Sequence, residues 1–379
     1  MAATPRPLAD YFADLRDPRV ALKCQHDFMA IILIVVCATL AGADDFVGMA
    51  TFANAKRGWS RERLGLNLDN GIPSHDTLNR VFAAIRPDEF GACFLAWVEA
   101  MSDGLKLEQI AIDGKAMRGS RRKTGAGYRT VQIVSAWASE NGATPAQVRT
   151  DEKSNEITAI PERLRLLDVS GALVSTDAAG CQRGIAAQVV AAGGDDLLAV
   201  KDNQPRLFED LGAMARAATE ADYAGLSRWA TDESAHDRRE FRFGFVMTNL
   251  TGIRDRDQWK GLRSVVCVVS GREVTGRKET SEVRYYISSR RGSGKMFLGA
   301  SRAHWGIENE CHWVLDVAFR EDDHRLREGH APENLSVVRK MALAMLKKAE
   351  ADMGIKNKRL KTGWDDTFLE HVLRDFLGN

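Results

Sequence analysis

The sequence predicts an α/β protein in which a mixed sheet follows an all-helical N-terminal region. Three observations favour this fold class. Residues 1–103 carry their apolar side chains mainly at helical spacing, whereas beyond residue 104 apolar strands form a hairpin and then alternate with helices. A further stretch, about 222–292, is rich in strand-forming residues. We therefore expect a helical domain at 1–103, a sheet-containing domain at 104–350 with a β-rich insertion, and a basic C-terminal tail or helix at 351–379.

Composition and charge limit the class of protein. A chain of 379 residues with 44% apolar and 28% charged side chains can form about two globular domains. The formal net charge is +1, so a nucleic-acid-binding surface would have to be local. The six cysteines form no CxxC pair, which favours free thiols in a reducing compartment. The apolar run Phe28–Ala41 is too short to cross a bilayer, and the N-terminus lacks the order of a signal peptide. These features predict a soluble, cytoplasmic protein without a membrane partner.

The helical region contains a candidate DNA-binding surface. Lys56–Arg63 is a basic patch, and Ser74 is a suitable N-cap for the helix that follows. A helix, a basic turn and a capped helix are the parts of a helix-turn-helix reader, with Arg57 and Arg80 facing DNA. A plain helical bundle with a solvated basic turn fits the same pattern.

Two short apolar strands each run into an aspartate. The strand Gln109–Lys115 contains Asp113 before a glycine, and the strand Ala172–Asp177 ends in Asp177. We expect both carboxylates at the carboxyl ends of strands, where open α/β sheets bind their ligands. An aspartate at a strand end is also a common turn residue, so each aspartate alone is a weak signal.

The other elements follow from apolar periodicity and turn signals. Asn141-Gly142 predicts a two-residue hairpin. It would join strands over 131–139 and 143–150; helices are expected over 156–167, 182–192 and 205–218, and strands over 197–201, 241–247, 264–270 and 282–288. Pro332 suits the first turn of a last long helix.

The stretch Arg302–Gly329 is predicted to be a helix that carries a third carboxylate. Its apolar stripe at helical spacing consists of Ile307, Cys311, Val314 and Ala318. His304, Glu308 and His312 recur every four residues on the neighbouring face. A carboxylate beside an apolar seam needs a partner, such as a metal ion.

Asp113, Asp177 and Glu308 together indicate divalent-metal chemistry. Three carboxylates that a fold brings together repel each other unless cations neutralise them. Two Mg²⁺ ions in such a site suit an in-line displacement at phosphorus. Glu310 is a rival for Glu308, but it lies about 200° around the helix. A zinc site built on His304, Glu308 and His312 is the weaker alternative, because no HExxH order is present.

Several motifs give the chain a close resemblance to the ISAs1-family insertion-sequence transposases and the related H-repeat-associated proteins. In chain order they are Ile112-Asp113-Gly114-Lys115, Ser175-Thr176-Asp177, Val200-Lys201-Asp202-Asn203-Gln204 and the run HWGIENECHWVLDV from His304 to Val317. The resemblance covers nearly the whole chain. It implies an RNase H-like catalytic core with a DDE triad of Asp113, Asp177 and Glu308, and it identifies the β-rich block as an insertion in that core.

The resemblance also implies an activity, a cofactor and partners. The expected activity is DNA transposition, in which the protein cleaves strands at the element ends and joins the freed ends to target DNA. Mg²⁺ is the expected cofactor, with Mn²⁺ as a substitute. Double-stranded DNA, as terminal inverted repeats and as target, is the expected partner. A homodimer is expected because two ends must be joined.

Further side chains are expected to contact DNA. They are Lys115, Arg118, Lys201, Asn203, Gln204, Arg302, His304, His312, Arg57 and Arg80. His304 stands where the wider IS4 group carries an arginine, so the hairpin chemistry of that group is not carried over. We expect Trp305 and Trp313 in the core, with base stacking as the alternative.

Two other functions remain open from the sequence. One is a domesticated DDE nuclease that acts in recombination, which the absence of inverted repeats around its gene would favour. The other is a non-catalytic DNA-binding protein in which the acids only support the fold. Divalent metal would bind and stabilise a true triad but would have little effect on a binding-only protein.

Overall fold

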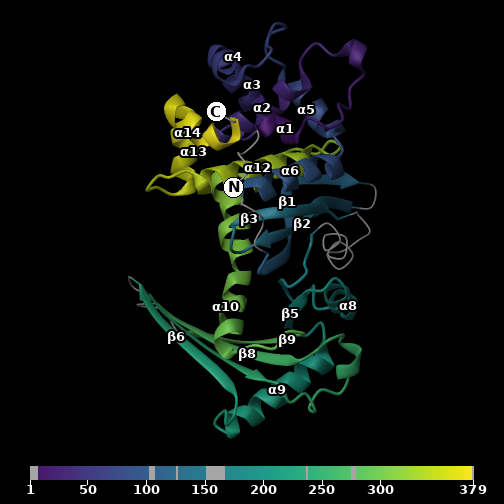
Figure 1. Ribbon diagram of the computed structural model, residues 1–379, viewed down its shortest axis with the longest axis vertical. Coiled ribbons are helices and arrows are strands. Elements are labelled where there is room, and N and C mark those ends of the chain that lie inside the picture. Colours follow the sequence, from purple (N-terminus) through teal and green to yellow (C-terminus); the bar gives the residue numbers. More distant parts are fainter. Residues whose placement is uncertain are drawn as a thin grey trace.

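The dominant feature of the chain is a nine-stranded mixed sheet (Figure 1). A computed structural model describes residues 7–101, 107–124, 127–150, 167–235, 238–274 and 279–377. The strands are β1 (Gln109–Thr124), β2 (Gly127–Ala138), β3 (Ala143–Arg149), β4 (Leu173–Thr176), β5 (Asp195–Val200), β6 (Ser227–Ala235), β7 (Arg238–Met247), β8 (Ser264–Val274) and β9 (Thr280–Ser288). Their order in the sheet is β3-β2-β1-β4-β5-β9-β8-β7-β6. The expected boundary at 103–104 lies outside the described residues, as does nearly all of the expected helix over 156–167.

The first five strands have the RNase H-like arrangement. β1, β2 and β3 pair antiparallel, and β4 and β5 run parallel to β1. A hairpin joins β2 and β3 at Asn141-Gly142, as predicted, and Gly142 is in the left-handed region at φ 58°. The prediction of a two-residue loop is wrong, because Ala138 pairs with Ala143 and residues 139–142 form the turn. Helix α8 (Arg183–Ala191) connects the parallel strands β4 and β5. The predicted α/β class with a mixed sheet is therefore confirmed.

The β-rich stretch extends this sheet from its free edge. β9 pairs antiparallel with β5, and β8, β7 and β6 follow in order, each antiparallel to its neighbour. Helix α9 (Pro205–Glu220) packs against these strands at the bottom of the view in Figure 1. Because one continuous ladder joins the two parts, the inserted strands are held in a fixed position relative to the core strands.

The N-terminal region is all-helical, as predicted. Its helices are α1 (Leu8–Tyr11), a 3₁₀ turn at Ala21–Lys23, α2 (Phe28–Leu40), α3 (Phe46–Ala55), α4 (Arg57–Leu64), α5 (His75–Ala84) and α6 (Pro87–Met101). The Ser74 hydroxyl accepts a hydrogen bond from the backbone N–H of Thr77, which confirms the predicted cap. The predicted basic turn is wrong, because Arg57–Leu64 forms helix α4. Arg63 of α4 pairs with Glu370 at 2.6 Å, so part of this charge is neutralised within the protein.

The C-terminal residues cover the helical region instead of forming a free tail. They form α12 (Ala331–Lys348), α13 (Ile355–Trp364) and α14 (Asp366–Leu377), and the last two helices lie beside the N-terminal helices in Figure 1. Two cations of the basic stretch in α13 are buried. Lys358 donates to the carbonyls of Leu346 and Ala349, and Arg359 donates to those of Thr39 and Ala318. These side chains stabilise the packing of the chain end.

Helix α12 lies between the helical region and the sheet. It is buried along nearly its whole length and packs on α2, α5 and α6 on one side and on β2 and β3 on the other. A single hydrophobic cluster runs from Leu8 through the strand residue Trp137 to Leu373. The helical region thus shares its core with the sheet domain. In the described part of the chain, no helix is both long and apolar enough to span a membrane.

The segment that carries Glu308 differs from a regular α-helix. It consists of α10 (Gly294–His304), a π-helix (Ile307–His312), α11 (Trp313–Phe319) and a 3₁₀ turn (Glu321–Asp323). The wider π-turn changes which residues face inward. Leu315 is fully buried, whereas Val314 of the predicted stripe is half-buried and packs against the same core. The other three residues of the predicted stripe are buried, as expected.

Gly119 lets strand β1 pass under the 3₁₀ turn that follows α11. A Cβ atom at Gly119 would lie 2.0 Å from the carbonyl oxygen of His324, a backbone atom that cannot rotate away. We therefore expect Gly119→Ala to lower the free energy of unfolding by about 2 kcal/mol or more. Denaturant titration measures this loss. Gly58→Ala in α4 is the control, because no atom lies within 4 Å of its added Cβ. Equal stabilities for the two variants would contradict the prediction.

Candidate active site

Two aspartates meet where the parallel strands β1 and β4 end their pairing. The last paired residues are Ile112 and Thr176, so Asp113 and Asp177 are the next residues on neighbouring strands. The sequence had suggested that Asp113 ends its strand. In the structure β1 continues to Thr124 through its pairing with β2. Alignment in register is what brings the two carboxylates to the same edge of the sheet.

The π-helix supplies a third carboxylate to the same place. Asp113, Asp177 and Glu308 line one pocket of about 210 Å³, together with Lys201, His304, Trp305, Arg284 and others. The Glu308 side chain is half exposed, at 51%, whereas the Asp113 side chain is 14% exposed. The rival Glu310 pairs with Lys347 at 3.0 Å and does not line this pocket. A deep aspartate and a more accessible glutamate thus face one small cavity.

His312 ties two of these acids together. Its Nδ1 lies 3.5 Å from Oδ2 of Asp113 and 3.8 Å from Oε2 of Glu308. Burial works against protonation of His312, but hydrogen bonds to Asp113 and Glu308 outweigh it and raise the pKa of His312 to about 9. Burial alone would raise the pKa of Asp113, yet the charge and hydrogen bond of His312 lower it. His312 is buried, so it is a partner of the acids and is not placed to contact DNA, contrary to the sequence-based expectation.

The donor set suits a hard divalent cation. One ligand atom each of Asp113, Glu308 and His312 lies within 4.8 Å of the others. Asp177 is outside this cluster, because its Oδ1 accepts a hydrogen bond from the backbone N–H of Gly180 at 3.2 Å. Carboxylate oxygens are the ligands that Mg²⁺ and Mn²⁺ prefer. This acidic cluster therefore fits a divalent metal ion.

His304 has a different role from the one expected. Its Nδ1 lies 3.0 Å from the hydroxyl of Ser175 on β4. Burial lowers the pKa of His304, although the nearby carboxylates partly oppose this effect. A neutral, hydrogen-bonded imidazole is poorly suited to pair with a phosphate. His304 therefore lines the pocket and is held there by its hydrogen bond to Ser175.

Lys115 belongs to a buried ion network that the sequence did not indicate. Its ammonium pairs with Asp316 and lies 2.7 Å from the Glu321 carboxylate. Glu321 is 1% exposed and lies 3.6 Å from the guanidinium of Arg339 in α12. Lys115 was expected to contact a DNA phosphate, but these ion pairs already use its charge. The acidic residues of the 3₁₀ turn after α11 are the only sequence signal for this network, and they look like ordinary surface charge.

The other expected DNA contacts are scattered over the molecule, and only Lys201 lines the acidic pocket. Arg118 is exposed and lies 3.5 Å from Asp322, and Lys201 is exposed and lines the acidic pocket. Asn203 donates to the carbonyl of Ala178 at 2.6 Å, so it braces the loop that carries Asp177. Arg302 pairs with Glu233 through both guanidinium nitrogens. Arg57 donates to the Leu68 carbonyl, and Arg80 is exposed on α5.

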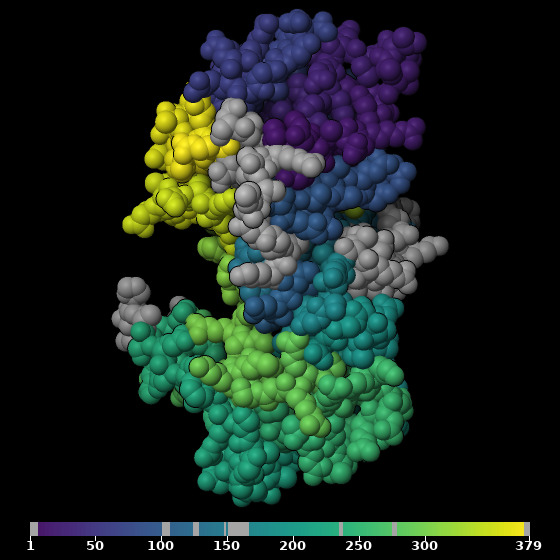
Figure 2. All heavy atoms as spheres, viewed as in Figure 1, coloured from purple at the N-terminus to yellow at the C-terminus, as the bar shows by residue number. Residues whose placement is uncertain are grey.

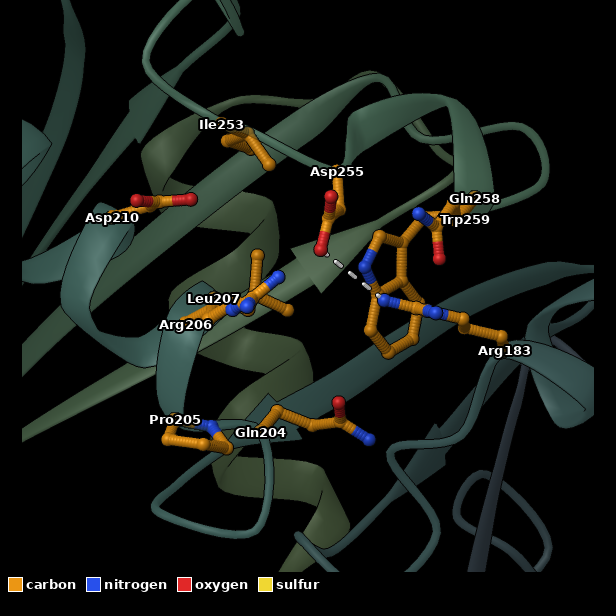
Figure 3. Close-up of a pocket in the computed structure, with 10 residues that line it drawn as sticks. All are labelled: Arg183, Gln204, Pro205, Arg206, Leu207, Asp210, Ile253, Asp255, Gln258 and Trp259. Atoms are coloured by element: carbon orange, nitrogen blue, oxygen red, sulfur yellow. Dashed lines mark hydrogen bonds and ion pairs between the residues drawn. The ribbon is translucent and has the colours of Figure 1, made fainter.

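Gln204 lines a second pocket, away from the acids. Figure 3 shows this pocket of about 350 Å³ between the first turns of α8 and α9 and the loop before β8. Gln204 donates to the carbonyl of Cys181 at 2.9 Å. On the far wall Arg183 lies over the ring of Trp259 and 3.5 Å from Asp255. The mixed charges of this pocket give it no clear preference for a ligand.

The sequence-based prediction that the two tryptophans of the HW motifs lie in the core is wrong. Trp305 is 40% and Trp313 is 61% exposed. The guanidinium carbon of Arg284 lies 4.6 Å from the centre of the Trp305 ring. Even at the regular 100° per residue, Trp305 and Trp313 lie about 160° and 120° around the helix from the buried Ile307, so both indole rings face outward.

An RNase H-like sheet with three carboxylates in one pocket at the ends of its parallel strands defines the class of DDE-type proteins. Comparison with known families agrees. Residues 104–345 match the family described as "Transposase DDE domain", and residues 9–98 match the one described as "DDE_Tnp_1-associated". This chain belongs to the transposase DDE domain family.

Relatives cover almost the entire chain. "Putative transposase YncI" of Escherichia coli O157:H7 is 39% identical over 97% of this chain and 94% of its own length. "H repeat-associated putative transposase YhhI" of Escherichia coli K12 is 35% identical over 97% of this chain and 98% of its own. Among solved structures, the piggyBac transposase synaptic complex with hairpin DNA aligns with a TM-score of 0.41 at 9% identity, over 97% of this chain and 76% of that one. The expected kinship with H-repeat-associated proteins is confirmed, and the narrower ISAs1 assignment stays a prediction.

Proposed function

We propose that this protein is an active DNA transposase whose catalytic residues are Asp113, Asp177 and Glu308. The observation that carries the proposal is their meeting in one pocket, although they come from β1, β4 and the π-helix. Three carboxylates are costly to gather in one place, and His312 contacts only two of them, which supports a role for a bound cation. Membership of the transposase DDE domain family supports phosphodiester exchange on DNA as the reaction type.

The chemistry needs two displacements at phosphorus. In the first, a water oxygen attacks the phosphodiester at an element end, and the bond to the 3′ oxygen breaks to leave a 3′-hydroxyl. In the second, that 3′-hydroxyl attacks a phosphodiester of target DNA, and a target 3′-hydroxyl leaves. Each step forms one P–O bond and breaks one, so neither step needs ATP. Two Mg²⁺ ions, when bound, would supply the positive charge that this in-line displacement requires.

The side chains of the pocket would bind the cations, position the carboxylates and contact the DNA. Asp113 and Glu308 would hold one cation, and Asp177 would share in the site after releasing the N–H of Gly180. His312 would hold the Asp113 carboxylate in place. Lys201, exposed at the rim, is placed to contact a phosphate of the bound strand. A homodimer that pairs two DNA ends is part of the proposal, because transposition joins both ends.

Metal binding alone separates this proposal from a non-catalytic DNA-binding protein. We expect Mn²⁺ or Mg²⁺ to raise the thermal unfolding midpoint, since an ion at 100 times its Kd stabilises the folded state by about 2.7 kcal/mol. Asp113→Asn should abolish most of this shift, because it removes a ligand charge of the cluster. Glu310→Gln, in the same π-helix but outside the pocket, should keep the shift. Equal shifts in the two variants would place the metal elsewhere.

The experiment that tests the full function is cleavage of duplex DNA carrying the sequences that flank the gene, with and without Mg²⁺. Metal-dependent nicks at the element ends, followed by joining to a second duplex, would establish transposase activity. Cleavage without joining would favour the domesticated nuclease, and binding without cleavage would favour a DNA-binding protein. Size measurement of the DNA complex would show whether two protomers bind two ends.

A further inference from the structure

The segment that carries Glu308 connects two parts of the molecule. Its first helix, α10, packs on the inserted strands β6 and β7, and α11, which follows the π-helix, packs on α13 near the chain end. In Figures 1 and 2 the inserted strands (green) lie in the lower half of the molecule and α13 (yellow) lies in the upper half. Asp113 lies on a third element, the core strand β1. A metal site shared by Asp113 and Glu308 therefore requires contacts that hold this segment against β1.

Two side chains on one face of β1 contact the segment. Side chains alternate along a strand, so Asp113 and Lys115 point to the same side of the sheet. Nδ1 of His312 lies 3.5 Å from Oδ2 of Asp113. The Lys115 ammonium pairs with Asp316, which lies one helical turn after His312. The strand and the segment are thus joined by two adjacent contacts, one in the acidic pocket and one beside it.

The contact of Lys115 is part of a buried ion network. The Lys115 side chain is 11% exposed, and its ammonium also lies 2.7 Å from Oε2 of Glu321. Glu321 is buried and lies 3.6 Å from the guanidinium of Arg339 in α12. Charges that are shielded from water interact strongly and are screened little by salt. The network therefore fixes the end of α11 on both β1 and α12.

The backbone at the end of α11 is adapted to this network. Arg320 has φ 51°, a left-handed conformation that residues other than glycine rarely adopt. It ends α11, and the next residue, Glu321, faces inward whereas Arg320 and Asp323 remain exposed. Such a backbone conformation persists where the surrounding contacts hold it. On the other side of the turn, Gly119 of β1 packs directly under the carbonyl oxygen of His324.

We propose that Lys115 is a positioning residue for the metal site. Its ion pairs hold the segment against β1 at the spacing at which Glu308 and Asp113 bind one cation. Lys115 itself touches neither the cation nor DNA. This inference rests on the proposed function, because it takes Asp113 and Glu308 as metal ligands. It adds a residue that sets the geometry of the site from outside the pocket.

Mn²⁺ binding measured by isothermal titration calorimetry, without DNA, tests this role. Lys115→Met keeps the length of the side chain but removes the ammonium. We expect it to weaken Mn²⁺ binding about 10- to 100-fold, the usual cost of losing a residue that orients metal ligands. A direct effect of charge has the opposite sign, because removing one cation strengthens the binding of another. A purely structural role would lower the thermal unfolding midpoint and leave the Mn²⁺ affinity of the folded protein unchanged.

Asp316→Asn breaks the same ion pair from the other side. The Asp316 side chain is 35% exposed, so this variant perturbs the fold less than Lys115→Met does. We expect it to weaken Mn²⁺ binding as well. In a double-mutant cycle the two changes together should weaken binding less than the product of the separate losses, because both remove one contact. Losses that multiply would contradict a shared contact.

Matched controls separate position from charge and from stability. Arg118→Met removes an exposed cation of the same strand and should leave the Mn²⁺ affinity unchanged. Asp210→Asn breaks the ion pair with Arg254 on α9, away from the acidic pocket, so it should lower stability without changing Mn²⁺ affinity. Thermal unfolding without metal checks that each variant is folded at the temperature of the binding measurement.

The proposal is overturned if folded Lys115→Met binds Mn²⁺ as tightly as wild type, or more tightly. If Asp113→Asn loses binding while Lys115→Met keeps it, only the positioning role fails and the proposed function stands. Equal affinities for wild type and Asp113→Asn would instead place the metal outside the pocket. In that case both the proposed metal site and the role of Lys115 would fail.

Discussion

Glu308→Gln is expected to reduce metal-dependent strand cleavage about 10³-fold or more while leaving the fold intact. The change keeps the size of the side chain but removes the charge that shares a metal site with Asp113. A metal ion contributes several kcal/mol to the stabilisation of transition-state charge, and about 4 kcal/mol corresponds to this factor. Because the Glu308 side chain is half exposed, its loss should have little effect on stability. The measurement is the initial rate of nicking on DNA with flanking element ends.

Asp113→Asn and Asp177→Asn should show losses of similar size, since each removes one charge from the same pocket. Glu310→Gln is the matched control, because Glu310 lies on the same π-helix but pairs with Lys347 outside the pocket. The catalytic assignment of Glu308 fails if Glu308→Gln cleaves at the wild-type rate. It also fails if Glu310→Gln is the variant that loses cleavage.

Glu321→Gln is expected to have the largest effect on stability, about 3–5 kcal/mol. Glu321 is 1% exposed and faces Lys115 and Arg339 from the turn after α11. Removing one partner of a buried ion pair leaves the other charges uncompensated, which costs this amount. Asp323→Asn, in the same turn, is the control, because Asp323 is exposed and its pair with Arg320 contributes at most about 1 kcal/mol. Denaturant unfolding of the two variants measures the difference.

The lowered pKa of Glu321 also predicts how the stability of the protein changes at acid pH. Burial would raise the pKa of Glu321, but Lys115 and Arg339 outweigh burial and lower it from 4.5 to about 2. A lowered pKa means that the stabilising contribution is complete above about pH 4.5 and is lost as the pH falls toward 2. A shift of this size corresponds to roughly 3 kcal/mol. If Glu321→Gln and wild type lost stability in parallel between pH 5 and 2, the network would not be responsible.

Much of the fold could be predicted from local signals. The helical N-terminal region, the Asn141-Gly142 hairpin and the Ser74 cap depend on residues close together in the sequence, and the structure confirms them. Apolar strands followed by aspartates predicted that two carboxylates would lie at one edge of the sheet, and the register of β1 and β4 agrees. The motif resemblance supplied the RNase H-like order that periodicity alone could not give.

The sequence-based interpretation was wrong where side-chain type alone was used to place a residue. Trp305 and Trp313 were expected in the core, but both lie on the side of the segment away from Ile307 and are exposed. The π-helix Ile307–His312 was not predicted either, because the α-helical period was assumed for the whole segment. Likewise, the basic stretch Lys56–Arg63 has the composition of a turn, but packing beside the C-terminal helices makes it α4.

The sequence by itself determined the local elements and the kinds of side chain available for chemistry. Only the tertiary structure decided which charges meet. It paired His312 with Asp113, buried Lys115 against Glu321, and set Arg284 over Trp305 in the lining of the acidic pocket. The reason is physical, since secondary structure follows from neighbours along the chain, whereas the partner of a charge depends on strand register and on packing between distant segments. Lys115, two residues after Asp113, therefore looks like a DNA contact in the sequence, but in the fold it belongs to a buried ion network.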